Sequence, residues 1–462
     1  MAYQGKHESE EDFLRRIQKW QQLRVIGVTL FTLLILTVGG VCLCKALADK
    51  KSLPVSANQD AVYVLGEKGF EQDGVQYDNG DKEILSEENT LSYIEDTSES
   101  TEGIPTATPE TFSLMMVGDD LLHKPVSDSG RQSDGTYRYD ELFRNVKKDA
   151  KAADLAMINQ EVILGGEELG VSGYPRFNGR QEVGDAIAKA GFNMVLHATN
   201  HSMDKGKEGI LRCLSYWDTV KCSGRKGEKK KNITVTGMYD TEKEANKITT
   251  FEANEITVAV LNYTYGTNGL PLPYDMPSAV NLMETQKVKK DVKKAKKIAD
   301  FVIVCPHWGT EYKLEADTYQ LTWAKKLADW GVDLIIGTHP HVVEPVKWVK
   351  GKNGHQTLVY YSLGNFINSN VSSYTGVSKQ YYGGMAKVEL VRREDGEVEI
   401  DQAKFVPLIT HWSVSTGKLT TYKVEDYTKK LWQDNRLRWK DGSFTLENMK
   451  EFFNDVVGKK WM

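Results

Sequence analysis

The chain has few cysteines, a single long apolar run and no large excess of charge of either sign. Five cysteines in 462 residues are too few for a disulfide scaffold, and only Cys213 and Cys222 are candidates for pairing with each other. A net charge of −5 argues against a nucleic-acid partner, because such proteins usually carry a dominant basic face. The 40% apolar fraction nevertheless supplies enough side chains for a large core.

The one long apolar run is long enough to cross a bilayer. Residues 25–44, VIGVTLFTLLILTVGGVCLC, contain no charged side chain. A cleaved signal peptide is the alternative, since 46–48 (Ala-Leu-Ala) has a small-x-small pattern, but the length of the run and of the segment before it favours a retained anchor. The slight excess of basic residues before the run predicts a single-pass protein of the cell membrane, with residues 1–24 in the cytoplasm and the remainder outside.

The remaining residues divide into three predicted parts. Residues 45–110 are acidic and rich in Ser, Thr, Asn and Gly, so they cannot bury enough apolar surface to fold and are expected to form a flexible tether. In residues 111–410 apolar runs alternate with amphipathic stretches, which predicts a layered α/β domain. Residues 411–462, rich in Trp, Lys and Asp, are expected to pack as a C-terminal appendage.

The pattern inside 111–410 also locates individual elements. Helical periodicity is clearest in residues 181–191 and 318–331. Residues 286–300 are also amphipathic, with their lysines on the polar, solvated face. Short apolar runs predict strands at 113–117, 155–158, 193–198, 257–263, 301–305, 333–337 and 357–364.

Polar side chains follow most of these predicted strands. Because the loops beyond the carboxyl ends of strands in α/β sheets meet at one edge, these side chains are expected to lie together. His339 and His341 flank Pro340, and in an extended segment residues i and i+2 point the same way. Carboxylate, amide and imidazole groups in this mixture suit Mn, Fe or Zn, and a bridging carboxylate can hold two such ions.

Six motifs, in this order, resemble those of the CapA family of membrane-anchored proteins associated with poly-γ-glutamate capsule synthesis. They are MVGDDLLH, NQEVIL, ATNHSMDKG, PHWGTEY, GTHPHVVEPV and YYSLGNF, and the resemblance covers about residues 111–410. It implies a calcineurin-like metallophosphoesterase fold, with a two-layered β core flanked by helices and a site for two divalent ions. Thr199 departs from the pattern, since the family often has Asn there.

The resemblance also implies a role for individual residues. Glu161 takes the bridging place between the two ions, and His201 stands beside the substrate as an acid or electrophile. The other metal ligands are Asp119, Asn200, His307, His339 and His341. His123 and His197 are left without a role.

Three functions remain open at this stage. The first is an assembly factor for poly-γ-glutamate synthesis and export, with the membrane subunits of the synthase as partners. The second is a surface metal-dependent phosphoesterase or hydrolase acting on a nucleotide, a lipid-linked phosphate or a cell-wall polymer. The third is a binding module for an anionic polymer that has no catalytic activity. A fold does not by itself choose among them.

Overall fold

The structure, a computed structural model, describes residues 110–222, 231–370 and 376–462. The predicted cytoplasmic segment, the predicted anchor at 25–44 and the predicted tether up to residue 109 lie outside these ranges. Within them, no helix has both the length and the apolar character that a membrane crossing requires.

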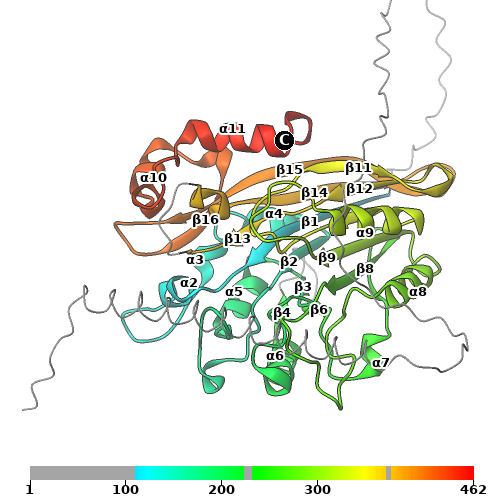
Figure 1. Cartoon of the computed structure of the whole chain (residues 1–462), viewed down its shortest axis with the longest axis horizontal. Coiled ribbons are helices and arrows are strands. Elements are labelled where there is room, and N and C mark those ends of the chain that lie inside the picture. The colour runs from blue at the N-terminus through cyan, green and yellow to red at the C-terminus, as the bar shows by residue number, and fades with distance from the viewer. Residues whose placement is uncertain (1–109, 223–230, 371–375) are drawn as a thin grey trace, which may run out of the picture. The chain divides into compact units, whose positions relative to one another are not determined.

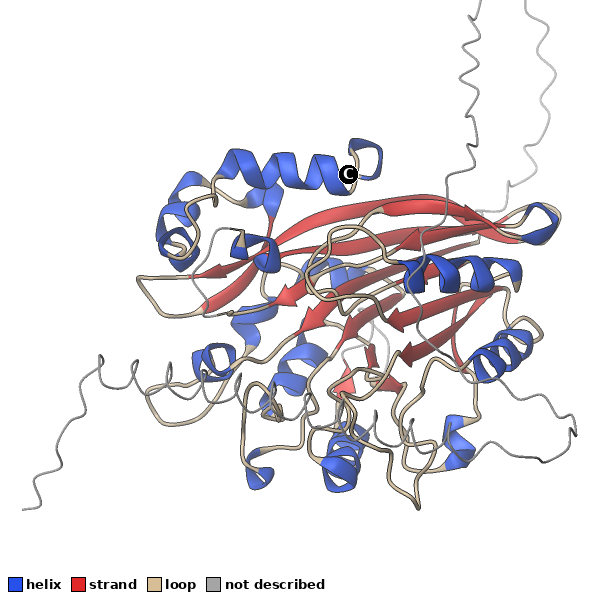
Figure 2. Cartoon of the chain, in the orientation of Figure 1, coloured by secondary structure: helices blue, strands red, loops and turns tan. Residues whose placement is uncertain are grey.

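Two large mixed β-sheets form the centre of the described chain (Figures 1 and 2). The first has the order β16-β15-β14-β1-β2-β3-β6, with β13 also paired to β1, and the second has the order β11-β12-β10-β9-β8-β7. The strands of the first sheet are β1 (Thr111–Asp120), β2 (Leu155–Asn159), β3 (Met194–Leu196), β6 (Thr234–Thr236), β13 (Asn365–Ile367), β14 (Tyr382–Arg392), β15 (Val398–Trp412) and β16 (Leu419–Lys423). Those of the second are β7 (Thr249–Ala253), β8 (Ile256–Thr264), β9 (Phe301–His307), β10 (Leu334–Ile336), β11 (Val346–Lys350) and β12 (Gln356–Tyr360), and β4 (Lys221–Cys222) and β5 (Lys231–Asn232) pair separately.

Helices lie along the outer sides of the two sheets (Figure 2). The α-helices are α2 (Lys124–Ser129), α3 (Asp140–Phe143), α4 (Lys147–Ala152), α5 (Glu182–Ala190), α6 (Gly206–Thr219), α7 (Glu242–Ala245), α8 (Thr285–Ala295), α9 (Thr318–Asp329), α10 (Lys429–Asp434) and α11 (Leu446–Val456). Short 3₁₀ turns are η1 (Glu167–Leu169), η2 (Lys352–Gly354), η3 (Val377–Tyr381), η4 (Val424–Asp426), η5 (Arg436–Trp439) and η6 (Lys459–Trp461).

Alternating side chains of the strands build the layers. In β1, Leu114 and Met116 join the apolar cluster between the sheets, whereas Met115 and Val117 join the cluster under α3 to α6. A third cluster packs the outer face of the second sheet against α8 and α9. The order is therefore helix, sheet, sheet, helix, which agrees with the predicted β core flanked by helices.

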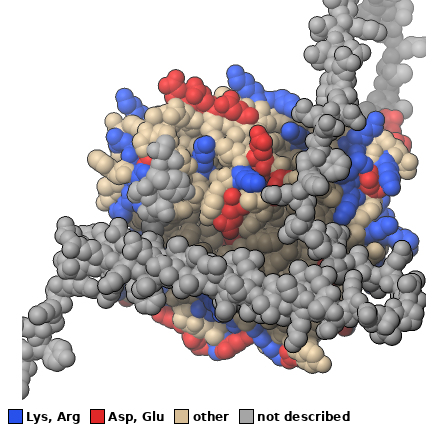
Figure 3. All heavy atoms as spheres, in the orientation of Figure 1, with Lys and Arg blue, Asp and Glu red and all other residues tan. Residues whose placement is uncertain are grey.

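Local sequence signals explain where the predicted helices begin and end. The N-cap of α9 is Asp317, which forms a capping box with Gln320, and α5 ends at Gly191, whose φ of 113° suits glycine. In α8 the buried side chains include Val288 and Val292, and most of its lysines are exposed. Figure 3 shows Lys and Arg side chains gathered at the right of this face, with Asp and Glu among them.

The apolar runs predicted as strands all fall on strands, but several other strands were missed, including β6, β7, β11 and β13 to β16. The predicted boundary at 410/411 lies inside β15, and β16 continues the same sheet through antiparallel pairing with β15. Helix α11 adds Met449 and Phe453 to the cluster between the sheets. Residues 411–462 thus pack against the domain, extending its first sheet through β16 and its core through α11.

The three cysteines in the described part of the chain, Cys213, Cys222 and Cys305, are buried and form no disulfide with one another. The Cys213 thiol lies 3.3 Å from the Leu164 backbone nitrogen, and that of Cys222 lies 3.4 Å from the Lys231 carbonyl oxygen. The pairing of Cys213 with Cys222 considered from the sequence is therefore not formed.

Candidate metal centre

The candidate site lies where strands of both sheets end. β1 runs parallel to β2 and β13, and β9 runs parallel to β8 and β10, so polar residues following these strands gather at one edge. Close packing of β1 against the chain before β13 fixes Asp119 there. Its backbone N–H donates to the Gly364 carbonyl at 3.0 Å, and a Cβ added at Gly118 would lie only 1.9 Å from that same oxygen.

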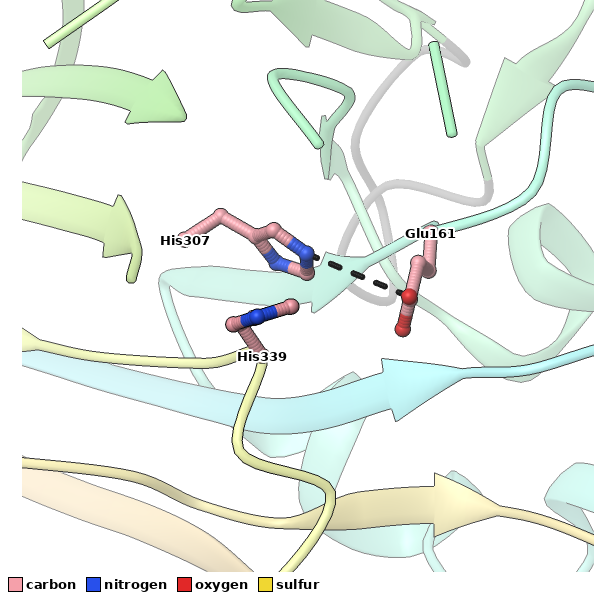
Figure 4. A group of neighbouring side chains, drawn as sticks. All are labelled: Glu161, His307 and His339. Atoms are coloured by element: carbon pink, nitrogen blue, oxygen red, sulfur yellow. Dashed lines mark ion pairs between the residues drawn. The ribbon is translucent and has the colours of Figure 1, made fainter. Parts of the chain in front are cut away.

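Two groups of possible metal ligands share Glu161. One comprises Asp119, Glu161 and His341, and the other Glu161, His307 and His339; all of these side chains are buried. His341 Nε2 lies 3.6 Å and His307 Nε2 lies 3.9 Å from Glu161 Oε1. Figure 4 shows His307, at the end of its strand, and His339, on its loop, turned toward Glu161. This sharing places Glu161 where a bridging carboxylate would stand.

Glu161 has the features expected of a ligand for a cation. Neither of its oxygens has a hydrogen-bond partner among the described residues, although the side chain is fully buried. Burial raises its pKa well above the usual range, while the charge of His341 acts in the opposite direction. Burial of a carboxylate that makes no hydrogen bond costs folding free energy, and a metal ion bound between these side chains would offset that cost. The carboxylate and imidazole groups present fit such an ion.

The histidines divide into neutral and charged forms. Burial, followed by the proximity of His339 and His341, lowers the pKa of His307 well below its usual value, and burial also lowers that of His339. Burial acts to lower the pKa of His341 as well, but the Glu161 and Asp119 carboxylates outweigh it and raise the pKa to about 10. Neutral imidazole is the form that binds metal, and a proton on His341 supplies positive charge that an ion would replace.

The loop carrying His339 and His341 has a different geometry from the one expected. Their φ angles are 100° and 57°, so the segment is not extended, and the i, i+2 argument does not explain why both rings face the site. The backbone N–H of His339 donates to Asp119 Oδ2 at 3.1 Å, which holds the turn against the end of β1. As a result the two rings, with centroids 5.7 Å apart, join different groups on either side of Glu161.

The structure brings Asn200 and His201 to the same place. Asn200 Oδ1 lies 2.9 Å from His307 Nε2, next to the group that contains His339. His201 Nδ1 lies 2.7 Å from Asp204 Oδ2, and its Nε2 lies 3.9 Å from Glu161 Oε1. An Nδ1–H bonded to the carboxylate would direct Nε2 toward Glu161. All seven predicted site residues are thus neighbours, and their role as ligands or acid stays a prediction.

An open cleft of about 690 Å³ reaches the site from the side of His341 and His201. Its wall includes the aromatic side chains of Tyr174, Phe177 and Tyr312, and Tyr174 is 77% exposed. Phe177 packs edge-on against His201 with ring centroids 4.7 Å apart. The cleft gives a ligand larger than a single phosphate access to the candidate metal centre.

Several supporting residues were not predicted. Asn159 Nδ2 donates to Asp119 Oδ1 at 2.8 Å, Asp204 orients His201, and Asn365 Oδ1 lies 3.0 Å from His341 Nδ1. Asn159 and Asn365 each stand directly after a predicted strand, and this position was the signal in the sequence that could have identified them as site residues. Such partners fix the orientation of metal-binding side chains.

The two histidines without an assigned role have different surroundings. His197 is fully buried, and its Nε2 accepts from Trp217 Nε1 at 2.8 Å, so it ties α6 to the end of β3. His123 lines the cleft and packs edge-on against Phe177. Burial, followed by the charges of His341 and His201, lowers its pKa to about 4, which keeps the ring neutral.

Similarity to solved structures is weak. A 5′-nucleotidase precursor from Thermus thermophilus is 14% identical, with a TM-score of 0.39 over 65% of this chain and 54% of the other. NAD nucleotidase from Haemophilus influenzae is 12% identical, with a TM-score of 0.40 over 75% of this chain and 67% of the other. This chain therefore spans about half of the first of these proteins, and at such scores neither bears on its substrate.

Similarity to curated sequences is stronger. The PGA biosynthesis protein CapA of Bacillus subtilis (strain 168) is 25% identical over 350 residues, which cover 74% of this chain and 84% of that protein. The capsule biosynthesis protein CapA of Bacillus anthracis is 29% identical over 273 residues, covering 56% of this chain and 60% of that protein. The model of the bacterial capsule synthesis protein family PGA_cap matches residues 113–370, a range containing every candidate site residue. The chain belongs to this bacterial capsule synthesis protein family.

Proposed function

We propose that this protein is a membrane-anchored, extracellular component of poly-γ-glutamate capsule synthesis and export, with a site for two divalent ions at the edge of its sheets. Family membership supports the capsule role. The observation that carries the metal site is the position of Glu161, which belongs to both groups of ligands and has two buried oxygens without hydrogen-bond partners among the described residues.

The residues of the site have distinct roles in this proposal. Asp119 and His341 would hold one ion, His307, His339 and Asn200 the other, and Glu161 both. Bound ions of Mn, Fe or Zn would supply Lewis acidity and lower the pKa of a coordinated water. His201, held by Asp204, would donate a proton from Nε2 to the leaving group or a hydrogen bond to the substrate.

The location of the protein is also part of the proposal. The charge-free run at 25–44 would anchor the chain, and the acidic residues after it would let the domain reach outward from the membrane. Membrane subunits of the polyglutamate synthase would then be neighbours in the same bilayer. The support is the sequence pattern and the family, since these residues lie outside the described ranges.

A second function, surface metal-dependent hydrolysis of a phosphoester or polymer bond, is favoured by one observation. The pair of His201 and Asp204 stands beside Glu161 at the wall of an open cleft, as a general acid would. A polymer-binding module without activity has no need of such a pair.

Deletion and complementation test the capsule role. Loss of the gene in the producing strain should abolish extracellular polyglutamate while the ATP-dependent ligase activity of membranes survives; a normal capsule would contradict the proposal. Complementation with His201→Ala then separates the two functions. Restored capsule would show that proton donation by His201 is dispensable, and failure at normal protein level would support a catalytic step.

Turnover by the full chain, purified in detergent, tests the hydrolase directly. We expect cleavage of an aryl phosphate ester or of polyglutamate that requires Mn²⁺ and is lost in His201→Ala. Absence of turnover on both substrates at full metal content would leave the assembly role and exclude hydrolysis of these two.

A further inference from the structure

Two buried polar groups in the wall of the cleft lack partners. Asn368 and Ser369 follow β13 directly and line the cleft together with His201 and His341. Asn368 is 1% and Ser369 0% exposed, and neither Asn368 Oδ1 nor Ser369 Oγ has a hydrogen-bond partner among the described residues. Because an unmade hydrogen bond at a buried group costs on the order of 1–3 kcal/mol, two adjacent cases call for a ligand or water.

The orientation of the Asn368 amide is fixed by its surroundings. Its nitrogen Nδ2 donates to the Gln380 backbone carbonyl at 3.1 Å. A carbonyl oxygen can only accept, so the opposite amide orientation would place two acceptors together. Oδ1 is therefore the atom left without a partner, and it requires an N–H or O–H donor.

The side-chain amide of Asn365, in contrast to that of Asn368, has partners for both its nitrogen and its oxygen. Asn365, three residues earlier, uses Nδ2 for the His341 and Gln380 carbonyls, and its Oδ1 lies 3.0 Å from the His341 ring. β13 lies beside the end of β1 (Figure 1). In this pairing Asn365 stands opposite Asp119. The unpartnered groups of Asn368 and Ser369 thus follow, in the chain, a residue that contacts the candidate metal centre.

We propose that Asn368 and Ser369 form a subsite for a secondary amide of the ligand. Oδ1 of Asn368 accepts the amide N–H, and the Ser369 hydroxyl donates to the adjacent carbonyl oxygen. A phosphate ester group that is fully ionised has only acceptors and cannot satisfy Asn368 Oδ1. The choice of an amide over a sugar hydroxyl rests on the proposed function, in which the polymer is a polyamide.

Binding by the full chain, purified in detergent and loaded with Mn²⁺, tests the subsite. The probes are a γ-linked glutamate hexamer, its analogue with ester linkages that lack the N–H, an α-linked glutamate hexamer and cellohexaose. We expect the γ-amide to bind at least tenfold more tightly than the ester, because the ester leaves Asn368 Oδ1 unpaired. Equal binding of the amide and the ester, tighter binding of cellohexaose, or no binding of either glutamate hexamer would overturn the proposal. Comparison of the γ- and α-linked hexamers distinguishes capsule polymer from ordinary peptide as the source of the amide.

Variants separate binding from folding. Ser369→Ala removes a hydroxyl that has no internal partner among the described residues, so it should weaken γ-hexamer binding about three- to tenfold and leave the unliganded Tm unchanged or higher. Asn368→Leu should abolish the preference for amide over ester. Thr357→Val is the matched control. Thr357 lies on β12, away from the cleft, and its buried hydroxyl donates to the Val332 backbone carbonyl at 2.6 Å. This variant should lower the Tm and preserve both affinities.

Two results would contradict the subsite and leave the proposed function intact. If Ser369→Ala lowers the Tm but keeps the parental affinity for the hexamer, the hydroxyl has a structural role only and the subsite is contradicted. This test remains decisive if Asn368→Leu fails to fold, because it depends only on Ser369→Ala. Metal content measured on the same samples tests the other claim separately. A parent chain without metal contradicts the metal site whatever the hexamer result, whereas full metal content with no amide preference contradicts only the subsite.

Discussion

Replacement of Glu161 by Gln should have opposite effects on the metal-free and the metal-loaded protein. In the metal-free protein the carboxylate is fully buried and neither oxygen has a hydrogen-bond partner among the described residues, although His341 Nε2 lies 3.6 Å from Oε1. In the variant, Asp119 Oδ2 still lies 3.5 Å from His341 Nδ1 and remains as a partner for that ring. Gln has nearly the same shape and no charge, so the unfolding free energy of metal-free protein should stay the same or rise. Since burial of an unpaired group costs about 1–3 kcal/mol, the gain should not exceed a few kcal/mol.

The loaded protein should lose stability through the same change. Glu161 belongs to both groups of ligands, so its charge is removed from two positions at once. Loss of a ligand or its support typically costs at least tenfold in affinity. At a metal concentration of 100 Kd, binding stabilises the parent by about 2.7 kcal/mol per site, and a tenfold weaker site at the same concentration retains about half of that.

Thermal unfolding of parent and Glu161→Gln, each with chelator and with Mn²⁺, measures both effects. We expect the two Tm values to be similar in chelator, or higher for the variant, and the Tm rise on adding Mn²⁺ to be clearly smaller for the variant. An equal rise in both proteins would refute the assignment of Glu161 as a shared ligand. A large Tm loss in chelator alone would show that Glu161 has a structural role instead.

Three other perturbations have defined outcomes. His339→Ala and His341→Ala should each weaken metal affinity at least tenfold and so lower the metal content measured by elemental analysis. His201→Ala should keep the metal and lose turnover. Parental metal content in both the His339→Ala and the His341→Ala variant would contradict the site. Burial, opposed by a hydrogen bond from Gln320, raises the pKa of Glu344 from 4.5 to about 8, so the folded state keeps this proton and stability falls as pH rises between those values. Glu344→Gln should therefore match the parent at about pH 3.5 and exceed it at pH 9 by up to about 5 kcal/mol in urea unfolding. A parallel pH dependence of the two proteins would contradict this. Protease treatment of intact cells should release the domain by cutting within 49–110, and complete resistance would contradict the predicted tether.

The sequence was informative where strands are buried on both faces. Parallel strands such as β9 and β10 read as continuous apolar runs, and their polar successors identified the site residues. β15 was missed because much of it is partly exposed and mixes polar with apolar side chains, which hides a strand in a single sequence. Its long antiparallel pairing with β14 becomes evident only in three dimensions.

The contacts between strands and loops that build the site could not be predicted either. Asn159 reaches Asp119 because β2 pairs in parallel with β1 in a particular register, with a shift between Val117 and Asp119. The His339–His341 loop turns through left-handed backbone angles that no residue type there demanded. The residue types of the site were therefore readable, whereas their division into two groups around Glu161 was not.

Anomalous diffraction from crystals of the Mn²⁺-loaded protein, collected at the manganese absorption edge, tests the central claim most directly. We expect two peaks on either side of the Glu161 carboxylate. One should lie next to Asp119 and His341, and the other next to His307 and His339. A single peak, or peaks that do not contact Glu161, would contradict the shared-carboxylate centre.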